Sequence, residues 1–171
     1  MCQFSWCQVY YDFLEGLSKD DSRTFRNLVI SMVLHTDMEH HFALLTRFKM
    51  RAMVKPRWGD DMQDVTLVMQ MMLKCADLAH LSYDFCLHRA WVERLEEEMF
   101  RQGDREVTIG LPVSPLCDRT KKGITASQAD FIDFVAMDMF KQFTDVFPSA
   151  TSMLHGVMKN RAEWAHPCQK E

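Results

Sequence analysis

The chain has 171 residues, a formal net charge of −4, 47% apolar residues and 26% charged residues. These values fit one domain with a hydrophobic core and exclude an intrinsically disordered or polyelectrolyte chain. The slightly acidic balance also excludes a basic footprint for nucleic acid. Six glycines and five prolines are about half the average share, and such a scarcity of turn residues favours long helices over a many-turned β fold.

Cysteine usage indicates the cellular compartment. The six cysteines are scattered without a C-x-x-C pair, and no signal-peptide pattern precedes them. This distribution is typical of a reduced, cytoplasmic protein and not of a disulfide scaffold. The longest apolar stretches, residues 28–34 and 65–73, are too short or too interrupted to cross a bilayer, so no membrane span is predicted.

Apolar residues recur at helical spacing along most of the chain, and no run alternates as a strand would. Capping-box patterns begin the first helix at residue 18, the second at Thr36 and the fifth at Thr125. Ser82 or Asp84 is expected to cap the fourth helix, which stops at Gly103. Three glycines and two prolines between Gly103 and Thr125 predict one long loop. The sequence therefore predicts an all-α fold with helices over about residues 19–35, 36–53, 63–80, 84–103, 125–147 and 149–164.

Metal ligation is the first chemistry to consider, because the chain has seven histidines. No two of them lie three or four residues apart, so an H-E-x-x-H site is absent. Four pairs of a histidine and a carboxylate at helical spacing are interpreted as helix-surface pairs: His35–Glu39, Asp37–His41, Asp77–His80 and Asp84–His88. Asp77 differs because it ends the most apolar predicted helix, where a buried carboxylate would need a cation or a metal as its partner.

Gln128 and Phe131 lie at positions i and i+3, so an amide and an aromatic ring project from one face of a predicted helix. An amide can donate to and accept from the edge of a heterocycle, while a ring can stack on its face. This pattern is compatible with a purine pocket. The alternative is that Gln128 closes a capping box and Phe131 packs in the core. The sequence has no Gly-rich phosphate loop and no G-x-S-x-G elbow.

Seven motifs follow one another in register over about residues 10–166: Met32-Val-Leu-His-Thr-Asp-Met38, Lys74-Cys-Ala-Asp-Leu, Trp91, Phe100-Arg-Gln-Gly-Asp104, Gly110-Leu-Pro-Val-Ser-Pro-Leu-Cys-Asp118, Ser127-Gln-x-x-Phe-Ile-Asp133 and Asn160-Arg-x-Glu-Trp164. Together they resemble the class I cyclic-nucleotide phosphodiesterases. The resemblance implies that residues 1–171 are the C-terminal part of an all-α catalytic domain, a multi-helix orthogonal bundle of the HD type. That domain hydrolyses the 3′,5′-phosphodiester of cAMP or cGMP to the 5′-nucleotide at a centre of zinc with magnesium or manganese.

The resemblance also implies site residues. Asp77 matches the late aspartate ligand of the zinc ion. Gln128 matches the glutamine that hydrogen-bonds the purine, and Phe131 matches the ring that stacks on it. Leu95 is expected on the opposite face of the base.

Three further residues fall at positions near the base in that family. Met38 and Met99 are expected to line the pocket. His80 stands where many members carry asparagine, a departure that leaves the preference for cAMP or cGMP open. The segment from Gly110 to Lys122 corresponds to a mobile loop beside the pocket.

The family's H-N-x-x-H segment, with the acid histidine, and its H-D pair should precede residue 10. Neither His-Asn nor His-Asp occurs in this sequence. No catalytic residue is therefore assigned, and Asp77 alone cannot make a zinc site, which needs three or four protein ligands. Two interpretations stay open: part of an ordinary phosphodiesterase that is inactive by itself, or a non-enzymatic helical module that binds a nucleotide or a partner. Either one predicts an exposed apolar face that a second copy or a partner covers.

Overall fold

The computed structural model describes residues 14–54 and 57–165. Within these ranges every regular element is helical, which confirms the predicted all-α fold. The elements are α1 (Lys19–Leu34), η1 (Met38–His40), α2 (His41–Met53), α3 (Met62–Asp77), η2 (Ala79–Ser82), α4 (Phe85–Thr108), η3 (Ile124–Ser127), α5 (Gln128–Phe131), η4 (Ile132–Ala136), α6 (Met137–Val146), η5 (Pro148–Ala150) and α7 (Thr151–Ala165). The η4 segment is a π-helical turn, and the other η segments are 3₁₀ turns.

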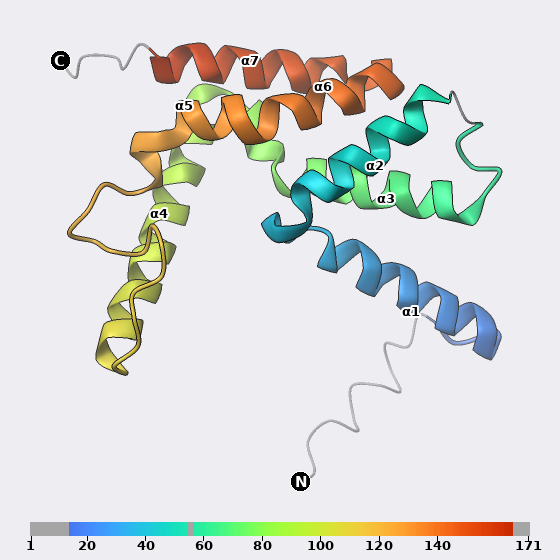
Figure 1. Ribbon diagram of the computed structural model, residues 1–171, viewed down its shortest axis with the longest axis horizontal. Coiled ribbons are helices and arrows are strands. Elements are labelled where there is room, and N and C mark those ends of the chain that lie inside the picture. The colour runs from blue at the N-terminus through green and yellow to red at the C-terminus, as the bar shows by residue number, and fades with distance from the viewer. Residues whose placement is uncertain (1–13, 55–56, 166–171) are drawn as a thin grey trace, which may run out of the picture.

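The core lies between four helices. α6 packs beside α7, and α2 and α3 pack against each other and against α6 (Figure 1). The side chains that meet there are almost fully buried and include Phe48 of α2, Met71 of α3, Phe140 of α6 and Val157 of α7. Two helices extend from this body: α1 contacts α3, and α4 projects from the opposite end (Figure 1). No helix in the described ranges combines the length and the apolarity that a bilayer span requires.

Side-chain caps mark the start of α1 and of the η1 turn that precedes α2. The Ser18 hydroxyl oxygen accepts a hydrogen bond from the Asp21 amide at 3.1 Å, as the predicted cap requires. Asp37 caps the η1 turn before α2, because its carboxylate accepts from the Glu39 amide at 2.9 Å. α2 itself begins at His41 without a side-chain cap. The Thr36 hydroxyl instead donates back to the Val33 carbonyl at 2.7 Å. The prediction that Thr36 is the cap was wrong, because Thr36 hydrogen-bonds to the end of α1.

The predicted stop at Gly103 was also wrong. α4 continues without interruption to Thr108, so the following loop is shorter than expected. A Cβ atom at Gly103 would lie 2.0 Å from the carbonyl oxygen of Cys117. The glycine thus allows the loop backbone to lie directly against α4, and it does not end the helix.

The capping box predicted at Thr125 does not form. The Thr125 hydroxyl is buried and has no hydrogen-bond partner, and the Thr125 amide donates to Glu96 of α4 at 2.9 Å. The Gln128 side-chain amide donates to the Ile124 carbonyl at 3.0 Å. Glu96 of α4 thus binds the Thr125 amide that Gln128 would bind in a capping box. A 3₁₀ turn, η3, precedes α5.

Candidate functional site

The elements that carry the predicted site residues are connected by contacts through η2, α7 and η3. The η2 turn packs against α3, α4 and α7, while α5 packs against α7 and η3 packs against α4. This arrangement gathers elements that are far apart in the sequence at one end of the body (Figure 1). Six predicted residues lie on these elements: Asp77, His80, Leu95, Met99, Gln128 and Phe131.

Met38 is connected to the same region through Lys74. The Lys74 side chain is buried, and its Nζ donates to the carbonyl oxygens of residues 35, 36 and 37 at 3.2, 3.0 and 2.9 Å. These carbonyl groups follow the end of α1, and that of Asp37 also accepts from the His40 amide at 3.2 Å. Burial lowers the pKa of Lys74. The turn that carries Met38 therefore lies beside the last turn of α3, which ends at Asp77.

Asp77 is exposed at the C-terminal end of α3. In the described ranges no three side chains of His, Cys, Asp or Glu gather closely enough to hold a metal ion. Since a zinc site needs three or four protein ligands, the residues present do not fit a complete zinc centre. Asp77 can supply one ligand to a metal whose other ligands come from elsewhere.

Gln128 has the clearest ligand-binding geometry. Its side chain is buried, and the bond from Nε2 to the Ile124 carbonyl fixes the amide plane. Its Oε1 atom accepts no hydrogen bond from the described residues and is not one of the fully enclosed oxygens. The amide oxygen is therefore the atom of Gln128 that can accept a hydrogen bond from a ligand. Phe131, one turn later, is half-buried and rests against the core.

The two α4 positions share one face, since Leu95 and Met99 are four residues apart. Leu95 is exposed and Met99 is half-buried. The same face continues toward the N-terminus of α4 through Trp91 and Leu87, both exposed. An aliphatic and aromatic stripe thus runs along an exposed face of α4, the helix that also contacts η2.

His80 belongs to a hydrogen-bonded chain of three rings. The Nδ1 atoms of His80 and His88 are 3.1 Å apart, and Trp164 Nε1 donates to His88 Nε2 at 2.8 Å. The indole N–H can only donate, so His88 Nε2 is the acceptor and the His88 proton is on Nδ1. That proton is donated to His80 Nδ1, which leaves the His80 proton on Nε2. The hydrogen bonds between the three rings therefore fix the tautomers of His80 and His88, and His80 Nε2 is left as a donor.

Burial keeps both imidazoles neutral at pH 7. Burial is the main cause, and the neighbouring His80 the second cause, that lowers the pKa of His88 to about 4. Burial also lowers the pKa of His80, and the charge of Asp77 opposes this shift. A neutral His80 keeps the single donor that the three-ring chain assigns to it.

Sequence reasoning missed His88 and Trp164. The interpretation of Asp84–His88 as a surface pair was wrong, because His88 is fully buried. The spacing between His88 and Val92 could have indicated that His88 is buried, because residues four apart share a helix face and Val92 is fully buried. The pair Asp37–His41 was misinterpreted in the same way, since His41 is fully buried and its Nε2 bonds the Val135 carbonyl at 3.1 Å.

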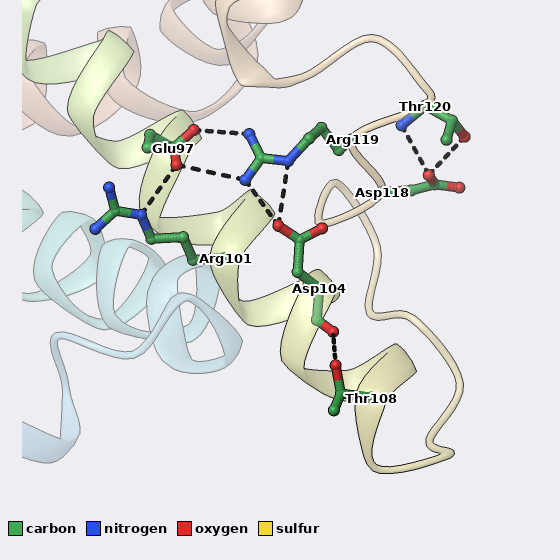
Figure 2. Close-up of polar contacts among 7 residues, drawn as sticks. All are labelled: Glu97, Arg101, Asp104, Thr108, Asp118, Arg119 and Thr120. Carbon is green, nitrogen blue, oxygen red and sulfur yellow. Dashed lines mark hydrogen bonds and ion pairs between the residues drawn. The ribbon is translucent and has the colours of Figure 1, made fainter.

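The loop after α4 is held against that helix by charged contacts. Figure 2 shows Arg119 between two carboxylates, with 2.8 Å from Nη1 to Glu97 Oε2 and 2.8 Å from Nη2 to Asp104 Oδ2. The guanidinium carbon also lies 5.1 Å from the centre of the Phe100 ring. Hydrogen bonds from Arg119 and then Arg101 lower the pKa of Glu97 to about 2. Loop position is thus coupled to α4, the helix that carries Leu95 and Met99.

A separate hollow of about 650 Å³ lies between α2 and α6. Its lining includes Phe48, Trp58 and Asp138 and none of the predicted purine-binding residues. The stacked rings of Phe48 and Trp58, 5.3 Å apart, form its apolar wall. This hollow is therefore distinct from the candidate site around η2.

The chain is similar to known proteins over most of its length. The family described as 3′5′-cyclic nucleotide phosphodiesterase matches residues 3–157. A probable 3′,5′-cyclic-AMP phosphodiesterase, pde-4, of Caenorhabditis elegans is 38% identical over an alignment of 160 residues that covers 90% of this chain and 24% of that protein. A dual specificity calcium/calmodulin-dependent 3′,5′-cyclic nucleotide phosphodiesterase 1C of Mus musculus is 43% identical over 143 residues, 84% of this chain and 20% of that protein.

Solved structures show the same arrangement of helices. The structure of LmjPDEB1 in complex with IBMX has a TM-score of 0.78 and 33% identity, over 88% of this chain and 45% of that one. The phosphodiesterase domain of the Salpingoeca rosetta rhodopsin phosphodiesterase has a TM-score of 0.80 and 24% identity, over 89% of this chain and 47% of that one, and supports the fold alone. The chain spans about a fifth to a quarter of the two curated relatives and less than half of each solved chain. Because the family match covers more than half of its residues, the chain belongs to the 3′5′-cyclic nucleotide phosphodiesterase family.

Proposed function

We propose that this chain forms the purine-binding part of a cyclic-nucleotide phosphodiesterase catalytic domain and does not hydrolyse cAMP or cGMP by itself. The observation that carries the proposal is the buried, oriented amide of Gln128, with its oxygen still able to accept a hydrogen bond. Phe131 lies one turn further along the same segment. An amide and a ring in this relation match the edge and the face of a purine.

The proposed binding mode uses both faces of the base. Phe131 stacks on one face and Leu95 of α4 on the other, while Gln128 contacts the edge. Adenine and guanine each present a donor beside an acceptor, so one amide can bind either base. Met38, Met99 and His80 border the base, and the fixed Nε2 donor of His80 favours an acceptor atom on the ligand.

The proposed limit on activity comes from the metal site. Asp77 supplies one carboxylate toward zinc, which the family pairs with magnesium or manganese. The described residues offer no further cluster of ligands, and the sequence has neither the His-Asn nor the His-Asp pair of the family. With one protein ligand the chain cannot assemble the centre, so we expect nucleotide binding without turnover.

A second candidate function is a non-enzymatic module that binds a nucleotide or a protein partner. It is supported by the hydrophobic core between α2, α3, α6 and α7, which consists of almost fully buried side chains. The two candidates agree on nucleotide binding. They differ in whether the chain works together with residues that complete a metal centre. An in-frame H-N-x-x-H and H-D sequence before Met1 in the gene would favour the enzyme.

Isothermal titration calorimetry with cAMP and with cGMP tests the pocket. We expect Gln128→Ala and Phe131→Ala each to weaken binding about tenfold, the size of one lost hydrogen bond to a buried partner or one lost stacking contact. Phe134→Ala is the matched control, because Phe134 is on the adjoining π turn and 76% exposed. Equal affinity in all variants, or no binding of either nucleotide, contradicts the pocket. Metal-dependent turnover by the purified chain that is lost in Asp77→Ala contradicts the proposed inactivity.

A further inference from the structure

An irregular turn follows the segment that carries Gln128 and Phe131. α5, η4 and α6 succeed one another from residue 128 to residue 146 without an intervening loop (Figure 1). In η4 the hydrogen bonds have π spacing, because the Met137 amide donates to the Ile132 carbonyl, five residues earlier. A π turn holds about one residue more than an α-helical turn, and such turns are frequent at functional sites.

The π turn determines the direction of the two base-binding side chains. α6 is fixed in the core by Met139 and Phe140, both fully buried. Each residue rotates an α-helix by about 100°. If η4 became α-helical with the same number of residues, α5 would be rotated by about 100° relative to α6. Gln128 and Phe131 would then project in a different direction, so their placement depends on the π turn.

His41, the first residue of α2, hydrogen-bonds into this turn. Its Nε2 lies 3.1 Å from the carbonyl oxygen of Val135, 94 residues later in the chain. A carbonyl can only accept a hydrogen bond, so Nε2 carries the proton and donates it. A side chain that enters the hydrogen-bond ladder of a helix is a recognised cause of irregular helical geometry. The bond thus supplies the π turn with a donor from another helix.

The protonation state of His41 leaves the ring with this donor alone. The side chain is fully buried, and Nδ1 has no hydrogen-bond partner among the described residues. Burial, and secondly the positive charge of Lys74, lowers the pKa of His41. A proton on Nδ1 would also lack an acceptor. The imidazole is therefore neutral, and its one N–H is committed to the Val135 carbonyl.

α7 contacts the same turn through an ion pair. Arg161 donates to Asp133 of η4, with 2.6 Å from Nη2 to Oδ2 and 2.9 Å from Nε to Oδ1. Both side chains are more than one-third exposed, and exposed ion pairs contribute little to stability. The His41 side chain is fully buried, so a lost N–H at this position leaves its acceptor without an equivalent partner. His41 is therefore the stronger of the two contacts.

We propose that His41 is a positioning residue for the nucleotide: by donating to the Val135 carbonyl it holds the π turn that directs Gln128 and Phe131 toward the base. The proposal rests on the proposed function, because it assumes that these two side chains bind the base. It adds to that function a residue of α2, a helix that carries none of the predicted site residues. His41 acts through η4 and does not contact the nucleotide.

Three variants of α2 test the proposal by isothermal titration calorimetry with cAMP and with cGMP. His41→Leu removes the donor and should weaken binding about tenfold, the size of one lost buried hydrogen bond. His41→Gln keeps an N–H near the end of the side chain and should bind nearly as tightly as the unsubstituted chain. The matched control is Phe48→Leu, a fully buried position two turns later that lines the separate hollow. It should leave the affinity unchanged.

A deletion separates positioning from a general loss of stability. Phe134 lies in η4 and is 76% exposed. Deleting it from the His41→Leu chain removes the one residue by which a π turn exceeds an α-helical turn. α5 should regain its direction relative to α6, and most of the lost affinity should return. If His41 only stabilised the fold, this deletion would weaken binding further.

Nuclear magnetic resonance follows Gln128 without nucleotide. The side-chain amide resonances of Gln128 should shift in His41→Leu and stay unchanged in His41→Gln and Phe48→Leu. Three results overturn the proposal: unchanged affinity and unchanged Gln128 resonances in His41→Leu, equal effects of His41→Gln and His41→Leu, or no recovery on deleting Phe134. If the unsubstituted chain binds neither nucleotide, the proposed function is refuted, and the Gln128 resonances still show whether His41 positions that side chain.

Discussion

Replacing His88 with glutamine tests the buried three-ring chain through the pH dependence of stability. His88 is fully buried, and its pKa in the folded protein is about 4, against 6.5 for an ordinary histidine. The unfolded chain therefore binds more protons than the folded chain between pH 6.5 and 4. The stability that neutral His88 contributes is complete above pH 6.5 and is lost as the pH falls from 6.5 toward 4.

The size of the effect follows from the shift. Each pH unit between the two pKa values costs about 1.4 kcal/mol of unfolding free energy. Lowering the pH from 7.5 to 5 should thus remove about 2 kcal/mol through His88 alone. With a slope of about 2 kcal/mol per molar urea for a chain of this size, the unfolding midpoint should fall by about 1 M.

The assay is urea unfolding, followed by circular dichroism, at pH 7.5, 6 and 5. His88→Gln keeps an acceptor for the Trp164 N–H but cannot titrate, so its midpoint should fall by about 1 M less than that of the unsubstituted chain. His155→Gln, at an exposed position of α7, controls for the loss of a histidine as such. Equal pH dependence in the unsubstituted chain and His88→Gln would refute the assignment of His88 as a buried neutral base.

Three other substitutions test single contacts. Asn160→Ala removes two hydrogen bonds of 2.8 Å from a fully buried amide to the backbone around η2. Urea unfolding should show that the free energy of unfolding falls by about 2–3 kcal/mol. A decrease of less than about 0.5 kcal/mol contradicts this expectation. Gly103→Ala places a Cβ 2.0 Å from the Cys117 carbonyl oxygen. It should lower the melting temperature and reduce the free energy of unfolding by about 1–3 kcal/mol. An unchanged melting temperature means that the loop does not need this close contact. Arg119→Met removes the ion pairs to α4 and should speed thermolysin cleavage within residues 109–123 several-fold, whereas an unchanged cleavage rate shows that other contacts hold the loop.

Elements specified by neighbouring residues could be predicted well. The start of α1 depends on Ser18 and the amide of Asp21, three residues away, so the capping pattern predicted the helix boundary closely. The apolar periodicity of residues 63–80 likewise predicted α3, which spans Met62–Asp77. Caps and helical faces act over one turn of the chain, and a sequence displays such relations directly.

Contacts between distant residues could not be predicted in this way. Gly103 looks like a helix stop, but its role depends on the backbone of Cys117 in the returning loop. Placement of the candidate site has the same limit: the sequence indicates Gln128, and only the structure shows that the Ile124 carbonyl orients its amide.

His88 shows the difference most clearly. Its spacing from Asp84 suggests a solvent-exposed pair, yet Trp164, 76 residues later, hydrogen-bonds to it in the interior. By itself the sequence determined the helical class, the starts of α1 and α3 and the family motifs, because these depend on side chains within a turn of one another or on their order along the chain. Only the tertiary structure decided which histidines are neutral and buried, because burial depends on which distant segments come together.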